Sequence, residues 1–259
     1  MRLFQYLALA ILLLSTSLHA EALQKHITFA CSESTHSPLF KMLDIVFSHF
    51  FASHGYGFSM QTTSEQRMIS EVSSGRLDGA CGQNKPMFDA LNDPNLIRTT
   101  TPIANLAVRA LSREELSAIQ SLEELQHSSL KIGIIASTGT ALAAQQQGVH
   151  FDNIVTIDRG VRMLAANRLD YVVSNHIQIN RALNDLGSLA PLYISKILFH
   201  LPLYTIFNKE HLALIPSLDH YLSQLNQCLD GPLSQRNSAL WLDLSPRTIN
   251  LCLSPTPKD

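Results

Sequence analysis

Nine residues that could hold a small polar ligand follow short apolar segments in both halves of the 259-residue chain. They offer hydroxyl, carboxylate, imidazole, amide or ammonium groups, or an accessible backbone: Ser32, Glu33, His36, Gln83, Lys85, Thr138, Gly139, Thr140 and Asn175. In open α/β sheets, ligands bind beyond the carboxyl ends of the strands. We therefore expect these residues to line a cleft between two lobes and to bind a solute by hydrogen bonds and charge.

The segment Thr138-Gly139-Thr140 is a candidate seat for a carboxylate. It follows the apolar stretch 131–136 and precedes the helix-like stretch 141–147. The first backbone N–H groups of a helix lack partners within the helix, and the helix dipole favours negative charge there. Capping of the helix N-terminus by Ser137 or Thr138 would also account for these residue types. Capping the helix and binding a carboxylate are compatible roles. A phosphate-binding P-loop is excluded, because no Gly-Lys-Ser/Thr follows.

Neither a metal site nor a cofactor site is expected. His49 and His54 are five residues apart and do not share a helix face, and the cysteine spacings match no zinc pattern. Glu33 and His36 are the acid–base candidates for catalysis. However, no carboxylate pair and no Gly-x-Ser-x-Gly motif stands out. We expect a binding protein, not an enzyme.

The string Arg-Leu-Asp occurs twice, at 76–78 and 168–170, and each copy lies between a helix-like stretch and a short apolar strand. Gly75 and Asn167 precede the two copies. Both residue types tolerate the left-handed conformation that ends a helix. A helix, a tight stop and a buried strand, found twice, predict two α/β lobes.

The apolar pattern predicts the elements that position these residues. Strands are expected at 27–31, 58–62, 131–136 and 151–157, and helices at 38–53, 141–147, 214–229 and 232–242. Phe40 in the first helix is a wall of the cleft or, more simply, part of the core. Two long extended stretches, 102–111 and 198–208, flank the middle third of the chain. This arrangement predicts one lobe from 21–105 and 206–259, a second from 106–205, and a hinge of two chain crossings.

The first twenty residues have the features of a cleaved export signal. Arg2 supplies the positive start, 3–14 the apolar stretch and Ala20 the cleavage position. A membrane anchor would need about 17–25 apolar residues, and Gln5 interrupts this shorter run. The net charge of −2 lacks the basic excess that nucleic acid binding requires. We expect a soluble periplasmic monomer that is not embedded in the membrane.

Four cysteines, Cys31, Cys81, Cys228 and Cys252, are an even number in a compartment that permits disulfides. Cys31 and Cys81 end two strands that can be neighbours with level tips, so this pair is geometrically plausible. Cys228 and Cys252 would then close a short C-terminal loop. Four buried free thiols are the alternative, because unpaired cysteine is common in protein cores.

The chain resembles the periplasmic solute-binding proteins of the polar amino-acid type, bacterial extracellular solute-binding family 3. The resemblance rests on five short motifs in order: Ser74-Gly75-Arg76-Leu77-Asp78-Gly79, Ser121-Leu122-Glu123-Glu124-Leu125, Lys131-Ile132-Gly133-Ile134 running into Thr138, Asn167-Arg168-Leu169-Asp170 and Leu229-Asp230-Gly231. It implies the type II periplasmic binding fold: two doubly wound α/β lobes, joined by a double-crossover hinge, that close on a small ligand. A membrane permease of an ABC importer or a membrane sensor would be the partner.

Two positions depart from the family pattern. Asn175 stands where the family carries the aspartate that pairs with the ligand's α-ammonium. The family's arginine clamp for the ligand carboxylate has no counterpart in Asn84-Lys85-Pro86-Met87, where Lys85 is the nearest cation. The helix start at Thr138 and Lys85 favour an anionic group. The departures therefore predict a solute that carries a carboxylate or similar acceptor and needs no α-amino group.

Two alternatives remain open on the same scaffold. One is an enzyme similar to cyclohexadienyl dehydratase, because the group of proteins that the chain resembles contains that enzyme. The other is a protein-interaction module that has kept the fold and lost its ligand. Fold alone does not choose among a receptor, an enzyme and an interaction module.

Overall fold

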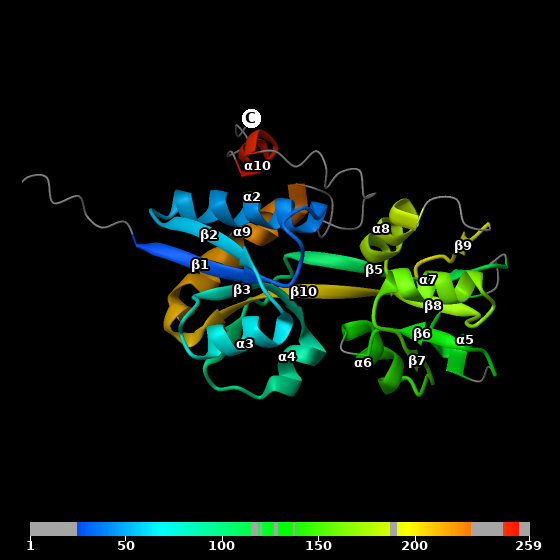
Figure 1. Ribbon diagram of the computed structural model, residues 1–259. Helices are drawn as coiled ribbons and strands as arrows, with labels where there is room; N and C mark the ends of the chain where they lie inside the picture. The colour runs from blue at the N-terminus through cyan, green and yellow to red at the C-terminus, as the bar shows by residue number, and fades with distance from the viewer. Residues whose placement is uncertain are drawn as a thin grey trace, which may run out of the picture.

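The computed structural model describes residues 25–114, 119, 121–126, 129–136, 138–186, 191–228 and 246–253. The chain forms two α/β lobes, which Figure 1 shows side by side with two long strands running between them. The expected export signal at 1–20 and the expected helix at 232–242 lie outside the described residues. Within the described ranges, no helix is long and apolar enough to cross a membrane.

The first lobe is built on three parallel strands. These are β1 (His26–Cys31), β2 (Gly57–Thr62) and β3 (Gly79–Asn84), with β1 between the other two. Its further elements are α2 (Pro38–Ser53), α3 (Glu65–Ser73), α4 (Lys85–Leu91), β4 (Leu96–Arg98), η2 (Lys209–Leu214), α9 (Ile215–Cys228) and α10 (Pro246–Leu253). Helices α2 and α10 lie on one side of the strands, and α3 and α4 lie on the other (Figure 1).

An aromatic cluster holds α2 against the sheet of the first lobe. The ring centroid of Phe29 on β1 lies between 5.0 and 5.5 Å from the rings of Phe47, Phe51, Phe58 and Phe207. Burying rings of this size contributes much of the apolar burial that stabilises a lobe. Phe40 is buried in the same core, so the simpler interpretation of this residue is confirmed. The predicted helix at 38–53 is also confirmed.

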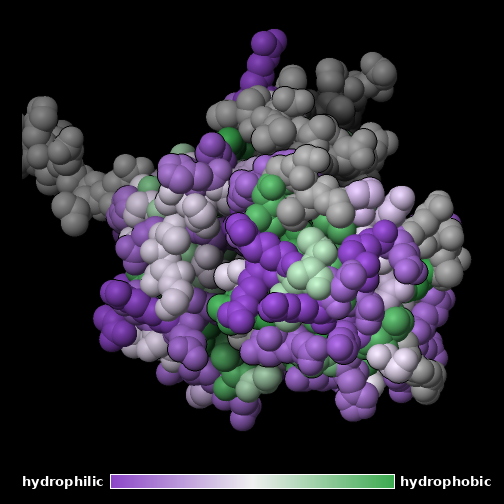
Figure 2. All heavy atoms as spheres, turned by 45° about the vertical axis from the view of Figure 1, so that its right-hand side comes forward, coloured by the Kyte–Doolittle hydropathy of each residue, from purple (hydrophilic) through white to green (hydrophobic). Residues whose placement is uncertain are grey.

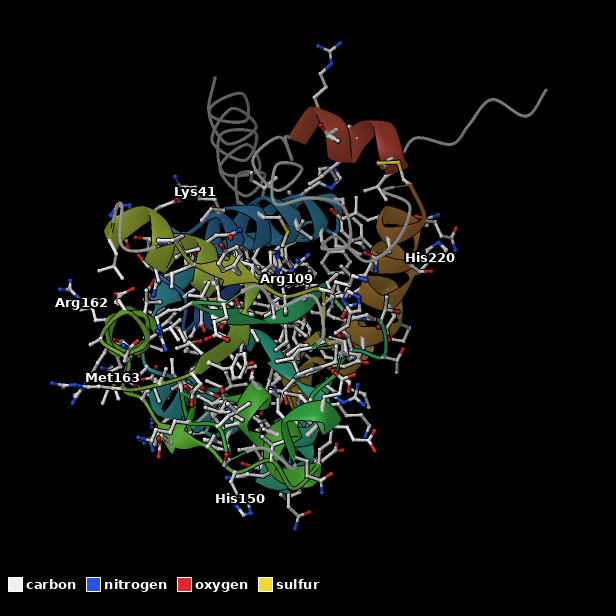
Figure 3. The ribbon with its side chains drawn as sticks, turned by 90° about the vertical axis from the view of Figure 1, so that its right-hand side faces the viewer. Lys41, Arg109, His150, Arg162, Met163 and His220 are labelled. Atoms are coloured by element: carbon white, nitrogen blue, oxygen red, sulfur yellow. A yellow bond between two sulfur atoms is a disulfide. The ribbon has the colours of Figure 1, made fainter. Side chains whose placement is uncertain are left out.

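The second lobe repeats the plan around β8 (Tyr171–Asn175), β6 (Ile132–Ile134) and β7 (Asp152–Asn153), which are parallel. Its helices are α5 (Glu123–Gln126), α6 (Gly139–Gln146), α7 (Ile157–Ala165) and α8 (His176–Leu186). Figure 3 looks onto this lobe and shows Arg162 on the outer side of α7, while Ile157, Val161 and Leu164 are buried. The face seen in Figure 2 is largely hydrophilic, with hydrophobic residues in small separate groups.

Strands β5 (Ala104–Ser112) and β10 (Phe199–Asn208) carry one sheet through both lobes, in the order β2-β1-β3-β10-β5-β8-β6-β7. The short β9 (Tyr193–Ile194) pairs with β5. In the antiparallel pair, Leu203 lies opposite Ala104 and Phe199 opposite Val108. These strands match the two extended stretches predicted at 102–111 and 198–208. They form the double crossing between the lobes.

The strand predicted at 151–157 is wrong. Strand β7 has only two residues, and α7 begins at Ile157. The apolar residues Phe151, Ile154 and Ile157 recur every third residue, which is not the two-residue period of a half-buried strand. Thr156 begins a helix where the strand was expected to continue, because its Oγ1 accepts a hydrogen bond from the Arg159 N–H at 3.2 Å and caps α7.

The two Arg-Leu-Asp units make the same contacts in both lobes. Gly75 and Asn167 have φ angles of 72° and 58°. Their N–H groups bond to Val72 O and Leu164 O, and the following arginine N–H groups bond to Glu71 O and Met163 O. This double pattern is the Schellman motif, and the predicted left-handed helix stops are confirmed.

Each aspartate of these units then ties its lobe's first strand in place. The Asp78 carboxylate accepts a hydrogen bond from the Thr28 N–H at 2.7 Å, and the Asp170 carboxylate accepts one from the Lys131 N–H at 2.8 Å. The Asp78 and Asp170 N–H groups donate back to Thr28 O and Lys131 O. The repeated string is therefore a structural joint that sets the register of neighbouring parallel strands.

Both expected disulfides are present. Cys31, the last residue of β1, is bonded to Cys81, which lies within β3 and not at its end as expected; their Cα atoms are 5.1 Å apart. Cys228 and Cys252 are bonded where α9 meets α10 (Figure 3). Within the described residues, the alternative of four free thiols is excluded, because no free cysteine remains.

Replacement of Gly75 by alanine should lower the free energy of unfolding by about 1–2 kcal/mol, because a side chain is strained at a positive φ. The nearest atom to an added Cβ is Asn208 Nδ2 at 3.7 Å, so the cost is conformational and not a clash. Urea unfolding of the chain from residue 21 onward measures it. Asn167→Gly is the control: glycine adopts the same φ freely, and a loss equal to that of Gly75→Ala would contradict this explanation.

Reduction of the disulfides should lower the melting temperature, since removing a native disulfide commonly costs about 2–5 kcal/mol. Peptide mapping without reduction should find the links 31–81 and 228–252. Variants that replace one pair with serines separate their effects. Labelling of all four cysteines by an alkylating agent in the unfolded, unreduced protein would disprove the bonds.

Candidate functional site

A cavity of about 110 Å³ lies between the two lobes, directly over the hinge strands. Its floor includes Leu106 of β5 and the two β10 residues Leu201 and Leu203. Along β3, Asn84 pairs with Leu203, and along β8, Asn175 pairs with Val108. These two strand tips therefore face each other across about four residues of β5, or roughly 13 Å at the usual rise of a strand.

Seven of the nine residues singled out from the sequence line this cavity: Ser32, Glu33, Gln83, Thr138, Gly139, Thr140 and Asn175. They come from both lobes, as expected of residues at the carboxyl ends of strands. Their contact with a ligand stays a prediction. The lining also includes twelve residues that were not expected to contact a ligand: Leu39, Leu43, Glu65, Met68, Cys81, Gly82, Asn84, Met87, Leu106, Gln178, Leu201 and Leu203.

His36 and Lys85 are not among the lining residues. His36 is exposed in the loop after β1, where its N–H donates to Ser34 Oγ. Lys85 begins α4, and its ammonium forms an ion pair with Asp89 one turn along the same helix. Both side chains of that pair are about half exposed. The anion-binding role expected of Lys85 therefore has no support from its position.

Four of the helices that start at the cleft are capped by side chains at their N-termini. Ser37, Asn84, Thr138 and Asn175 each accept a hydrogen bond from the backbone N–H three residues later, at 3.0–3.3 Å. Thr138 thus caps α6, as expected, and it also lines the cavity. The Thr138 hydroxyl also donates to Ile135 O at 2.7 Å, which fixes the turn between β6 and α6.

Asn175 has a structural task that limits what it offers to a ligand. Its Oδ1 accepts the Gln178 N–H at 3.0 Å, so this oxygen already caps α8. The Gln178 side chain lies beside it and accepts a hydrogen bond from the Ser174 hydroxyl at 2.6 Å. An amide at this position maintains the helix start, and it brings no charge to the cavity.

Two carboxylates, Glu33 and Glu65, give the cavity its formal charge. No lysine or arginine lines it among the described residues. Burial raises the pKa of Glu33, while the charge of Arg181 and the Ser37 hydroxyl act in the opposite direction. Arg181 is an exposed residue of α8, so this attraction acts between the lobes. Glu65 could have been found from the sequence, since it follows β2 in the way that Glu33 follows β1.

The lobes touch at the edge of the cavity, where Gly139 of α6 faces Asn84 of β3. A Cβ atom on Gly139 would lie 2.4 Å from Asn84 Nδ2 and 2.7 Å from Asn84 Cγ. Real Cβ atoms do not approach other atoms so closely, so only glycine permits this contact. Any side chain at position 139 would therefore disturb this contact between the lobes.

No known family profile matches the chain, and no curated protein sequence matches it. Solved structures do match. The lysine-bound putative binding component of an ABC transporter from Wolinella succinogenes has a TM-score of 0.61 and 14% sequence identity, and the match covers 81% of this chain and 93% of that one. The periplasmic VFT2 domain of BvgS from Bordetella pertussis has a TM-score of 0.59 and 12% identity, covering 92% and 96%.

A third match is the L-cystine solute receptor of Neisseria gonorrhoeae in an unliganded open conformation. Its TM-score is 0.54 at 14% identity, covering 82% of this chain and 90% of that one. At such low identity, these matches speak for the fold alone. The chain has the two-lobe fold of the type II periplasmic binding proteins, as the sequence predicted.

Proposed function

We propose that this protein is a periplasmic receptor that captures one small polar solute between its lobes. The observation that carries the proposal is a single cavity with polar lining residues from both lobes, placed over a two-strand hinge. Two of the compared structures are named as a solute receptor and as a transporter's binding component. Their names support binding without catalysis, which is what we propose for this chain.

The polar end of the solute would lie at the start of α6. The first backbone N–H groups of a helix have no partner within it, and the helix dipole favours an acceptor such as a carboxylate there. Thr140, in the same turn, is buried and lines the cavity. The apolar walls formed by Leu39, Leu106 and Leu203 suit an aliphatic portion of the same solute.

The receptor would deliver its solute to the permease of an ABC importer or present it to a membrane sensor. The export signal at 1–20, with cleavage near Ala20, would place it in the periplasm. Lobe movement would be the working motion, since domain closure around a ligand is a common transition of two-lobe binding proteins. The open, unliganded form of the compared L-cystine receptor supports such a movement.

Ligand binding should make the exported chain more compact and more heat-stable. A panel of amino acids, short peptides and organic acids is screened by thermal shift, because a bound ligand stabilises the folded state. For each ligand that raises the melting temperature, small-angle scattering should then show a smaller radius of gyration of the protein with the ligand than without it. An unchanged profile despite proven binding would rule out closure. Failure of every solute to raise the melting temperature would count against a receptor.

Gly139→Ala should weaken ligand binding by disturbing the closed contact with Asn84. Overpacking typically costs about 1–3 kcal/mol, which corresponds to roughly a 5- to 150-fold loss of affinity. Calorimetric titration measures the loss, and scattering should show a more open liganded form. The double variant with Asn84→Ser removes the crowded amide, retains a capping side chain and keeps the backbone N–H bond to Gln83 Oε1, so it should recover part of the affinity. No recovery would mean that the loss does not come from this contact.

A further inference from the structure

We infer that Glu65 is the group that binds a cationic part of the solute, so that the ligand carries an ammonium or guanidinium group. This inference rests on the proposed function and adds the chemistry of the ligand. It assigns the cation to the first lobe. The family pattern, in contrast, places the ligand's ammonium at position 175, in the second lobe.

Glu65 is held toward the cavity by Gln83. Glu65 is the first residue of α3 and lines the cavity half-buried. Its Oε1 accepts a hydrogen bond from Gln83 Nε2 at 2.5 Å. Gln83 itself is buried, at 7% exposure, so the carboxylate is anchored by a side chain that has little freedom of its own.

Asn84 fixes the orientation of the Gln83 amide. The backbone N–H and the Nδ2 of Asn84 both donate to Gln83 Oε1, each at 2.9 Å. A backbone N–H can only donate, so the oxygen of Gln83 must face Asn84 and its NH₂ group must face Glu65. The chain Asn84–Gln83–Glu65 therefore presents a carboxylate that keeps Oε2 available, since Oε2 has no partner among the described residues.

No positive side chain among the described residues neutralises Glu65. Arg181 attracts Glu33, Arg67 bonds to Glu71 Oε1 at 2.8 Å and Lys85 pairs with Asp89. Glu65 receives only a neutral amide donor. A buried charge without a counter-charge is strongly unfavourable, and closure of the lobes over a solute would remove water from this carboxylate. A cation on the solute supplies the missing counter-charge.

A purely structural role for Glu65 is the competing explanation. An acidic residue in the first turn of a helix interacts favourably with the helix dipole. That role requires no ligand and would affect stability alone. The cation-binding role predicts a change in ligand selectivity, so the two explanations differ in what they predict for binding.

The test uses matched ligands and a matched variant. The probes are ω-amino acids of four to six carbons, lysine and arginine, each compared with the corresponding carboxylic acid without its distal cationic group. The native protein should bind at least one of these probes more tightly than the counterpart that lacks the distal cationic group. Glu65→Gln keeps an acceptor for Gln83 and removes the charge. It should lower the affinity for that probe ten- to hundredfold, as expected for a charge-assisted hydrogen bond, and leave the affinity for the counterpart unchanged.

Two further variants keep the test decisive. Asp185→Asn makes the same change of net charge at an exposed site of α8 outside the cavity lining, and it should leave affinity unchanged. Glu65→Asp keeps the charge and should retain more affinity for the cationic probe than Glu65→Gln. If Glu65→Gln does not fold, Glu65→Asp must still prefer the cationic probe less than the native protein does.

Equal binding of both members of every pair, or an equal loss for both in Glu65→Gln, would overturn the inference. If anionic or neutral solutes bind with lobe closure while cationic probes do not, the receptor function stands and Glu65 is structural. If no solute binds, the receptor function fails as well.

Discussion

The backbone pairing of β5 with β10 is the interaction on which the arrangement of the whole molecule depends. Five residue pairs, from Phe199–Val108 to Leu203–Ala104, join these strands. β3 pairs with β10 on one side and β8 pairs with β5 on the other. This ladder therefore sets how far apart the tips of β3 and β8 lie, and it determines which side chains of the two lobes can reach the same solute.

The residues that shape the site also hold the fold together. Asn84, Thr138 and Asn175 each cap a helix, and loss of a cap commonly costs about 1 kcal/mol. Asn84 additionally orients Gln83 and touches Gly139. Substitution of such a residue changes stability and binding together. Variants that preserve capping, such as serine for asparagine, are the ones that can separate the two effects.

Local rules predicted much of this structure from the sequence. The Arg-Leu-Asp units, the helix stops at Gly75 and Asn167 and the helix at 38–53 depend on residues close in the chain, and all were predicted. The wrong strand at 151–157 also had a local cause, since capping by Thr156 outweighed the apolar pattern. The ion pair of Lys85 with Asp89 was not expected, because no helix was predicted at 85–91 and only a helix brings residues four apart together. The contacts of Glu65 with Gln83 and of Gly139 with Asn84 depend on the assembled sheet, so local patterns cannot reveal them.

The two lobes offer opposite electrostatic environments to a ligand. The first contributes the carboxylates Glu33 and Glu65, and the second contributes the positive end of the α6 dipole. A solute with an acceptor at one end and a cation at the other would be bound by both lobes, and only in the closed form would both ends be satisfied. A ligand shifts a conformational equilibrium only by its difference in affinity for the two states. Such a two-ended solute would therefore favour closure, whereas a solute with one of these groups would bind mainly one lobe and stabilise closure less. In the proposed receptor, the charge pattern of the cavity would thus link the recognition of the solute to a movement of the lobes.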